Sequence, residues 1–392
     1  MNSARPTATD RERRARLVRR HLLSPDVHAT RAEDVAEALV GLHATDPATV
    51  YLSARARMSE PSVDAVERAL YDDRTLHRLL AMRRTMFVVP DGLADLVHDS
   101  TGRAIADREL RDSQRFLQEA FGWDPDHRAG IEATVLAALR ARGEATAAEL
   151  AEDVPALAER VVIAPGKPYE STQAASSRLL RSLAARRLIE RGRPRGSWAS
   201  AQFRWRAADA TEATGRPAHE ARADLVRHYL ARFGPVTLAD VKWWTGWTLT
   251  ASRTALADVG AVEVDLAEGT GYLAPDDVEP VGDTSPSAAL LPGLDPTSMG
   301  WRDRGFYLDP DHVPALFDRN GNIGPTVWWD GRVVGAWAQR PDGSIGWRAL
   351  ADVGAEAAAR IDAETDRLAA WLEPTRVKPS YRTPLERELA EG

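Results

Sequence analysis

The chain has 392 residues and a formal net charge of −7 at pH 7, and this length suffices for two or three domains that each bury a core. It contains no cysteine, which excludes disulfides, thiol catalysis and cysteine-ligated metal centres. No apolar stretch approaches the roughly 18 residues of a membrane span, and no apolar segment follows the arginine-rich start as it would in a signal peptide. We therefore expect a cytoplasmic protein without membrane partners.

The charge is unevenly distributed along the chain. From Lys167 to Arg206 there are ten Lys and Arg residues against two acidic ones, a local balance of +8. From Gly260 to Asp311 there are eleven acidic residues against two arginines, a local balance of −9. This segregation favours contact between the basic segment and nucleic acid, although a basic face that is only solvated explains the charge equally well.

The N-terminal part of the chain predicts helices followed by a small ribbon of strands. Apolar spacing predicts helices over 10–22, over a segment that ends near residue 43, and over 48–57 and 62–71. Asp46 is expected to cap one of these helices, with Pro47 as its first residue. Extended runs follow at 77–80 and 85–89. This order is typical of a winged helix, and a polar helical connector is predicted over 93–121.

His43 and Thr45 lie at the elbow between two of these predicted helices. The unpaired N–H groups at the start of the following helix favour negative charge there. An imidazole and a hydroxyl at such an elbow could hold and polarise one water molecule. The alternative is that both side chains only satisfy local hydrogen bonds, because an isolated His-x-Thr pair is a weak motif.

The second part of the chain predicts a helix–turn–helix followed by a basic wing. Helices are expected over 127–142 and 147–151, and Ser171 and Thr172 are expected to cap a long helix that reaches Arg187. In that helix Ala175, Leu179 and Leu183 should face inward, whereas Arg178, Arg181 and Ala185 should face outward. The wing would consist of strands 188–190 and 201–205 and the Gly/Pro/Arg loop 191–196.

This arrangement would place the long helix against a DNA groove and the wing arginines on phosphates. A winged helix used for protein contacts is the alternative interpretation. The basic segment favours DNA. The candidate DNA-binding residues of this unit are Arg178, Arg181, Arg187, Arg191, Arg193 and Arg195.

The third part repeats the plan with a different surface. Helices are predicted over 218–233, from Thr237 to about 245 and up to 259, with wing strands at 262–264 and 271–273. Trp243, Trp244 and Trp247 recur at helical spacing, which is more typical of a core than of a base-stacking platform. This copy is therefore expected to pack rather than to read bases.

The last region predicts a β-meander. Asp330-Gly331 joins strands 326–329 and 332–337 in a hairpin, because both turn residues tolerate a positive φ. Arg332 is a possible phosphate contact, although a β-meander within the core is an equally good interpretation. A third strand over 345–350 and a helix over 354–372 follow.

The expected fold class is therefore mostly α with small β wings (α+β), with tandem winged-helix domains and a C-terminal β-hairpin and meander. We expect the division 1–126, 127–215 and 216–392. No His-x-His or His-Glu-x-x-His pair occurs, so no metal site is predicted. Neither a P-loop nor a dinucleotide fingerprint is present, and no cofactor is expected.

Several stretches together resemble a known family. They are residues 41–47 (GLHATDP), 84–90 (RTMFVVP), 291–296 (LPGLDP), 299–301 (MGW), 316–322 (LFDRNGN), the hairpin up to Gln339 and residues 382–389 (RTPLEREL). They are similar to winged-helix proteins of the AlkZ and YcaQ type, which are common in actinomycetes. The resemblance spans nearly the whole chain. It implies tandem winged helices that form a basic, C-shaped channel for double-stranded DNA.

The resemblance further implies a monofunctional DNA glycosylase for DNA repair of alkylation damage. Such hydrolases excise purines alkylated at N7 and in some cases unhook interstrand crosslinks. The catalytic motif of the family is Gln-x-Gln or Gln-x-Asp, on the stretch that corresponds to His43-Ala44-Thr45. This chain therefore departs from the family pattern at both catalytic positions.

An N7-alkylated purine is a cationic leaving group, so the enzyme mainly has to stabilise the sugar cation and place one water molecule. We expect neutral His43 to hold this water and to accept its proton with a pKa near the working range. Thr45 should orient the water. The alternative function is a non-catalytic winged-helix DNA-binding protein, such as a transcriptional regulator. Such regulators usually dimerise on half-sites, and because no dimerisation helix is evident we expect a monomer.

Overall fold

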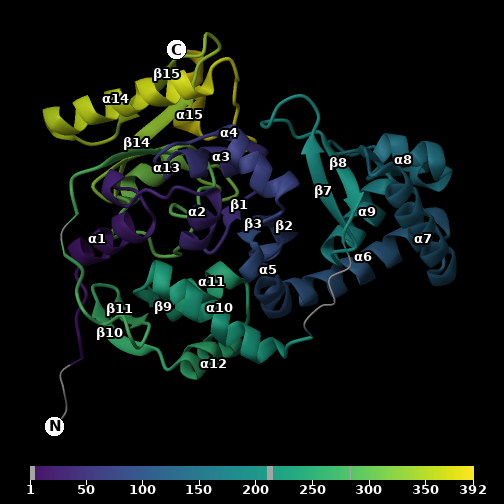
Figure 1. Cartoon of the computed structure of the whole chain (residues 1–392), viewed down its shortest axis with the longest axis horizontal. Helices are drawn as coiled ribbons and strands as arrows, with labels where there is room; N and C mark the ends of the chain where they lie inside the picture. The colour runs from purple at the N-terminus through teal and green to yellow at the C-terminus, as the bar shows by residue number, and fades with distance from the viewer. Residues whose placement is uncertain (1–4, 210–214, 283) are drawn as a thin grey trace.

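A computed structural model describes residues 5–209, 215–282 and 284–392. Helices and small antiparallel sheets alternate along the chain, which confirms the expected mixture of helices and short strands. Three of the sheets have three strands each. They belong to the first unit (residues 32–90), the second unit (residues 125–207) and the third unit (residues 218–273), and residues 284–392 form the C-terminal region (Figure 1).

Capping residues begin the helices of the first unit where the sequence predicted. The Asp46 carboxylate accepts a hydrogen bond from the Ala48 N–H at 3.1 Å, and Pro47 is the first residue of α3. Ser62 caps α4 through the Ala65 N–H. The elements up to residue 90 are α1 (Asp10–Arg20), α2 (Ala32–Ala38), β1 (Leu42–His43), α3 (Pro47–Arg55), α4 (Val63–Glu67), β2 (Leu76–Leu80) and β3 (Met86–Pro90).

The two-residue strand β1 was not predicted. Leu42 lies opposite Val88 and His43 opposite Phe87, so β1 pairs with one side of β3 while β2 pairs with the other. His43 therefore lies in a small sheet, and the elbow begins only after it. The turn between β2 and β3 contains Arg83 and Arg84 with φ angles of 54° and 60°. Positive φ is uncommon for residues other than glycine, so this turn is locally strained.

Two helices lead to the second unit, and its capping box is confirmed. The Thr146 hydroxyl accepts from the Glu149 N–H while the Glu149 carboxylate accepts from the Thr146 N–H. The elements are α5 (Asp91–Val97), α6 (Arg103–Phe121), α7 (Pro125–Arg142), β4 (Glu144–Ala145), α8 (Ala147–Asp153), β5 (Arg160–Ile163), β6 (Ser171–Ala174), α9 (Ala175–Ala185), β7 (Ile189–Pro194) and β8 (Phe203–Ala207).

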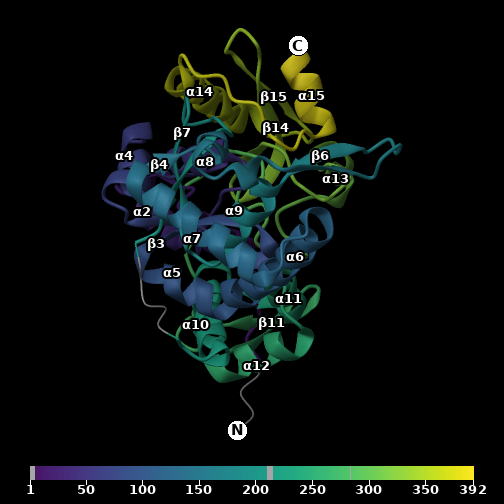
Figure 2. The ribbon, with the colours of Figure 1, turned by 90° about the vertical axis from the view of Figure 1, so that its right-hand side faces the viewer.

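The start of α9 differs from the prediction. Ser171 and Thr172 do not cap a helix but lie in β6, which pairs with β5 in a hairpin that projects from the second unit (Figure 2). Strand pairing satisfies the backbone of these residues, so α9 starts only at Ala175 and ends at Ala185. Its inward face is confirmed, because Ala175, Leu179 and Leu183 are buried.

Two further predictions for the second unit were wrong. Ala185 is buried rather than outward, since the last turn of α9 lines the cavity described below. Arg191 and Arg193 belong to β7 and not to a loop, because strand pairing continues to Pro194 opposite Phe203. The remaining loop carries Trp198, which is buried against other parts of the chain.

The third unit follows its predicted order. Thr237 and Thr248 cap its second and third helices. Trp244 is buried, and Trp243 and Trp247 pack against the same core, as expected for packing side chains. The elements are α10 (Ala218–Phe233), β9 (Val236–Thr237), α11 (Leu238–Thr245), α12 (Leu249–Val259), β10 (Val262–Leu266) and β11 (Gly269–Leu273).

A four-stranded meander and two helices form the C-terminal region. Asp330 and Gly331 have φ angles of 48° and 74°, and Trp329 pairs with Arg332 across them, which confirms the predicted hairpin. The elements are β12 (Ala288–Leu291), α13 (Val313–Leu316), β13 (Thr326–Trp329), β14 (Arg332–Gln339), β15 (Ile345–Ala349), α14 (Gly354–Leu372) and α15 (Pro384–Glu391).

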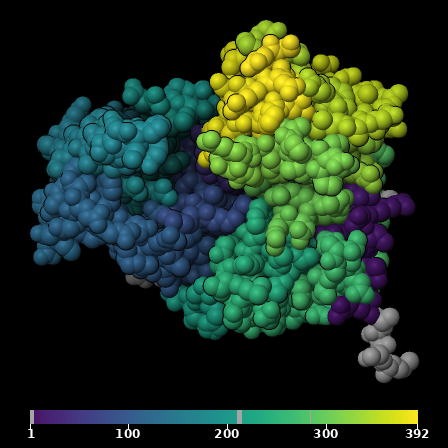
Figure 3. Space-filling view, turned by 180° about the vertical axis from the view of Figure 1, so that it is seen from behind, coloured from purple at the N-terminus to yellow at the C-terminus, as the bar shows by residue number. Residues whose placement is uncertain are grey.

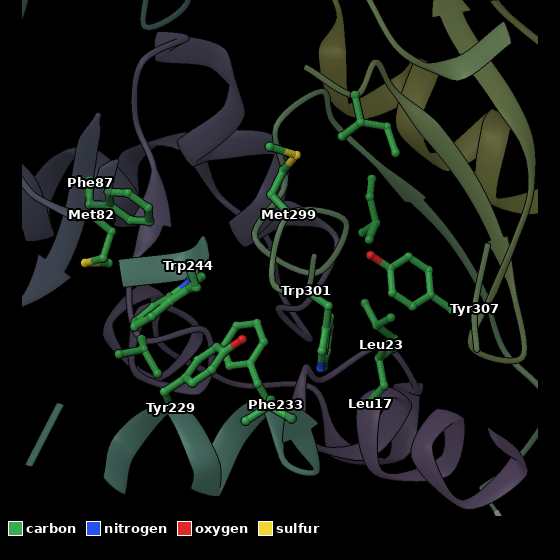
Figure 4. Packing of buried hydrophobic residues seen from close by; sticks show 14 of the residues in the cluster. Leu17, Leu23, Met82, Phe87, Tyr229, Phe233, Trp244, Met299, Trp301 and Tyr307 are labelled. Atoms are coloured by element: carbon green, nitrogen blue, oxygen red, sulfur yellow. The ribbon is translucent and has the colours of Figure 1, made fainter. Parts of the chain in front are cut away.

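The apolar cores show which parts fold against each other. One core joins the first unit, the third unit and the C-terminal region, and its aromatic side chains, among them Phe87, Trp244 and Trp301, lie between the elements of these parts (Figure 4). A separate core lies within the second unit and includes Leu117 and Trp123 from the end of α6 and the segment after it. Within the described residues, no helix is long and apolar enough to cross a membrane.

Candidate functional site

The elbow at residues 43–46 forms hydrogen bonds with the helix that follows it and with the C-terminal segment of the chain. One oxygen of Asp46 caps α3, and the other accepts a hydrogen bond from the Ser380 N–H at 2.7 Å. The segment before α15 therefore lies against the elbow. The Thr45 hydroxyl is buried and has no hydrogen-bond partner among the described residues. An unpartnered buried hydroxyl is costly unless a ligand or water satisfies it, so Thr45 is the better placed of the two predicted residues.

His43 is more buried than a water-activating base would be. Its side chain is 4% exposed, its ring lies edge-on to Phe87 at 5.2 Å, and its Nδ1 has no partner in the described part of the chain. Burial, and to a lesser extent Arg83, lowers the pKa of His43 to about 3. The imidazole is therefore neutral at ordinary pH. This corrects the expectation that its pKa lies near the working range, because desolvation disfavours the charged ring.

A cavity of about 580 Å³ opens beside Thr45. We call it the central cavity; the first unit, the second unit and Tyr381 of the C-terminal region line it. A space-filling view shows a hollow between the second unit and the C-terminal region with the first unit at its floor (Figure 3). Its polar lining residues are Thr45, Arg78, Arg84, Thr85, Ser176, Ser177, Arg181, Glu190, Arg191 and Tyr381. Thr45 lines the cavity, whereas His43, two residues before it in the sequence, does not.

The loop between β7 and β8 crosses from the second unit to the rest of the molecule. Trp198 packs against Tyr51 of α3 at 5.0 Å and against Trp371 of α14 at 5.6 Å between ring centroids. The second unit thus contacts the rest of the molecule at this loop as well as at α6. The contact of the wing arginines with phosphates stays a prediction, and the tryptophan of this loop is used for packing.

The comparisons with known proteins bear on this geometry. A family model of AlkZ-like DNA glycosylases matches residues 36–371. The chain belongs to the AlkZ-like DNA glycosylase family. The elbow and the residues lining the central cavity lie within the matched segment, except Tyr381.

Two comparisons connect this AlkZ-like protein with Streptomyces sahachiroi. It is 30% identical over 126 residues to an interstrand DNA cross-link repair glycosylase of that organism, over 30% of this chain and 34% of the relative. The chain thus spans about a third of the length of the curated relative that it matches. The solved structure of Streptomyces sahachiroi DNA glycosylase AlkZ matches 95% of this chain and 98% of that chain, with a TM-score of 0.69 and 21% identity. At this identity, the likeness establishes the fold.

In this AlkZ-like chain, the predicted DNA-binding arginines are distributed unevenly. Arg181 and Arg191 line the central cavity. Arg178 lies over Phe116, and Arg195 is exposed on the loop after β7. Arg187 pairs with Asp95 at 2.6 Å, and Arg193 pairs with Glu67 and Asp72 at 2.7 Å, so these two tie the second unit to other elements.

Arg332 is not brought together with the other candidates. It is exposed at the start of β14 and lines a separate cavity with Arg11, Arg14 and Asp330, on the side of α1. No cluster of histidine and carboxylate residues suited to a metal ion occurs in the part of the chain that the structure describes.

Sequence reasoning did not single out several residues of the central cavity, among them Arg78, Arg84 and Tyr381. Arg78 and Arg84 belong to β2 and to the strained turn after it, and Tyr381 belongs to the segment before α15. A signal for Arg78 was present, since it and His77 interrupt a strand whose other residues are leucines. No local pattern indicated Tyr381, because the neighbouring Ser380 is held by a hydrogen bond to Asp46, which is more than 300 positions away.

Proposed function

We propose that this protein is a DNA glycosylase that excises N7-alkylated purines from double-stranded DNA, including purines joined in interstrand crosslinks. Membership of the AlkZ-like family and the cross-link repair activity named for the Streptomyces relative support this proposal. The observation that carries it is the unpartnered Thr45 hydroxyl at the edge of an arginine-lined cavity. The cavity has the size of a small-molecule pocket, so a nucleotide would have to leave the duplex to enter it.

For excision of an alkylated purine, the main task of the protein is to position the nucleotide and the attacking water. The alkylated purine is already positively charged and departs without a general acid. Thr45 would orient the attacking water at the anomeric carbon, and His43 would act from behind as a neutral hydrogen-bonding group. A histidine with a pKa of about 3 is a poor proton acceptor at neutral pH. The water proton would therefore pass to solvent after the sugar cation is attacked.

The proposed function includes a fold of three winged helices in tandem. Each three-stranded sheet joins a short strand that follows a helix to a hairpin that follows two more helices. This order is typical of winged helices and supports the proposal, in which the units correspond to the divisions 1–126, 127–215 and 216–392. The winged helices would place duplex DNA along the hollow, with Arg178, Arg181, Arg191 and Arg195 toward its backbone.

A second candidate is a DNA-binding protein that releases no base. It is favoured by one observation: His43 is 4% exposed against Phe87 and does not line the cavity. In this interpretation the cavity binds DNA, and the changes from the family pattern at His43 and Thr45 have removed the catalytic activity.

Base release from duplex DNA that carries an N7-alkylguanine decides between the two. We expect wild type to form abasic sites, Thr45→Val and His43→Ala to lose at least about a hundredfold in rate, and His43→Gln to keep most of it. His77→Gln, at a half-buried histidine that pairs with Asp91 outside the cavity, is the matched control. Equal duplex binding by all variants would show that chemistry is affected. Tight binding by wild type without base release would refute the glycosylase and support the second candidate.

A further inference from the structure

Two arginines in the central cavity lack a carboxylate partner. Arg78 from β2 and Arg191 from β7 both line it. The Nε of Arg78 is buried without a hydrogen-bond partner among the described residues. The guanidinium of Arg191 lies 3.9 Å from the ring centroid of Phe203, which covers one of its faces. Within the described part of the chain, neither side chain forms an ion pair.

The carboxylates nearby are already engaged. Glu109 is shared by Arg84 and Arg181, and Glu190 pairs with Arg206. The lining therefore contains four arginines and one glutamate, a balance of +3. Burial, and next the neighbouring Arg78, lowers the pKa of Arg191 to about 10. Like charges that act on each other in a partly desolvated cavity are costly, and an anion bound by both would relieve that cost.

The other lining residues indicate what kind of anion fits. Phe203, Trp205 and Tyr381 provide aromatic surface in the same cavity, and Thr45 provides its unpartnered hydroxyl. A nucleotide combines an aromatic base with a phosphate, and arginine forks match phosphate geometry. We propose that Arg78 and Arg191 bind the backbone phosphate next to the extruded nucleotide and so place its sugar beside Thr45. This inference rests on the proposed DNA function.

The test measures binding to a duplex with a tetrahydrofuran abasic-site analogue at its centre. Its phosphates are natural, or a neutral methylphosphonate replaces the linkage on the 5′ or the 3′ side of the analogue. The variants are Arg78→Met and Arg191→Met. Arg204→Met, whose guanidinium pairs with Glu149 outside the cavity, is the matched control, and thermal unfolding verifies that each variant folds.

We expect wild type to bind one of the two methylphosphonate duplexes about tenfold more weakly, as removal of a hydrogen bond to a charged group predicts. Arg78→Met and Arg191→Met should bind the natural duplex about tenfold more weakly and show no additional weakening on that methylphosphonate duplex. Their salt dependence should be shallower by about 0.9 for each phosphate that the variant no longer neutralises. Arg204→Met should behave as wild type.

If an arginine variant loses further affinity on the methylphosphonate duplex that weakens wild type, the arginine and the phosphate act independently, and the proposal is overturned. Equal losses of wild-type affinity for the 5′ and the 3′ methylphosphonate duplexes would also overturn it. Inhibition of wild type by inorganic phosphate that depends on Arg78, without any effect of Arg78→Met on duplex binding, would assign the pair to a free phosphate and also overturn it. Because the probe contains no base to release, these outcomes are read independently of base excision. A failure of the glycosylase proposal is therefore distinguishable from a failure of this one.

Discussion

Two regions of this molecule contain buried or partly buried arginines that differ in whether their donors have partners. Around Asp295, Arg57 is fully buried and its donors reach both carboxylate oxygens at 2.7 and 2.9 Å, with further bonds to Thr297 and to backbone carbonyls. In the central cavity, Arg78 and Arg191 have no such partners in the described chain. A buried arginine with every donor satisfied belongs to the folded framework, whereas one left unsatisfied beside a cavity is available to a ligand.

The largest expected effect lies in the satisfied region. Asp295→Asn leaves the Arg57 charge buried without a counter-charge, and we expect a loss of about 3–5 kcal/mol in the free energy of unfolding. Urea denaturation measures this loss, with Asp311→Asn at an exposed position as the control. A loss below about 1 kcal/mol would remove the distinction between the two regions.

A pH series sharpens the comparison through the histidine of each region. Burial lowers the pKa of His21, which lies beside Arg57, well below its ordinary value. Burial lowers the pKa of His43 to about 3. Between that value and the unfolded value near 6.5, the unfolded chain binds more protons. The stability contributed by neutral His43 is thus complete above about pH 6.5 and is lost as pH falls toward 3.

We expect His43→Gln to reduce the loss of unfolding free energy between pH 7 and pH 4 by about 3 kcal/mol relative to wild type. Carboxylates that titrate in the same range are common to both proteins and cancel in the difference. An identical pH dependence of the two proteins would contradict a neutral, buried His43.

A smaller effect is expected in the unsatisfied region. Arg78→Met removes a charge that repels Arg191, so the free energy of unfolding should stay within about 1 kcal/mol of wild type or rise slightly. Thermal unfolding in buffer of low ionic strength measures it. Destabilisation as large as that of Asp295→Asn would show that Arg78 belongs to the folded framework.

The smallest effect is expected at an exposed pair. Arg193 bridges Glu67 and Asp72 with its side chain 42% exposed, so Arg193→Ser should cost no more than about 1 kcal/mol, and less at high salt. Urea denaturation of wild type and Arg193→Ser at two salt concentrations measures this difference in the free energy of unfolding. An effect that does not change with salt would point to the stacking of its guanidinium over the Tyr71 ring instead.

Local patterns predicted much of the fold because their causes are local. Asp46 before Pro47, the Thr146–Glu149 box and the Asp330-Gly331 turn each act within a few residues, and each is confirmed. The prediction for Ser171 and Thr172 failed because good capping residues can also form a strand when a partner strand is present.

The candidate site could be predicted only in part. The elbow was found because its capping residues and the family resemblance both marked it. The free or paired state of each arginine was not readable, since Arg187 and Arg193 find carboxylates about 90 to 130 residues away. The burial of His43 likewise depends on β1, whose two residues pair with a strand more than 40 positions later.

The contact of Trp198 with Tyr51 and Trp371 has a consequence for motion. The second unit is connected covalently to α6 before it and to α10 after it, and non-covalently through this tryptophan and the ion pairs of Arg187 and Arg193. If the aromatic contact opens to admit a nucleotide, the tether keeps the separated surfaces at a high effective concentration. Opening and closing would then be a first-order process whose rate is the same at any protein concentration, with α6 as its fixed arm.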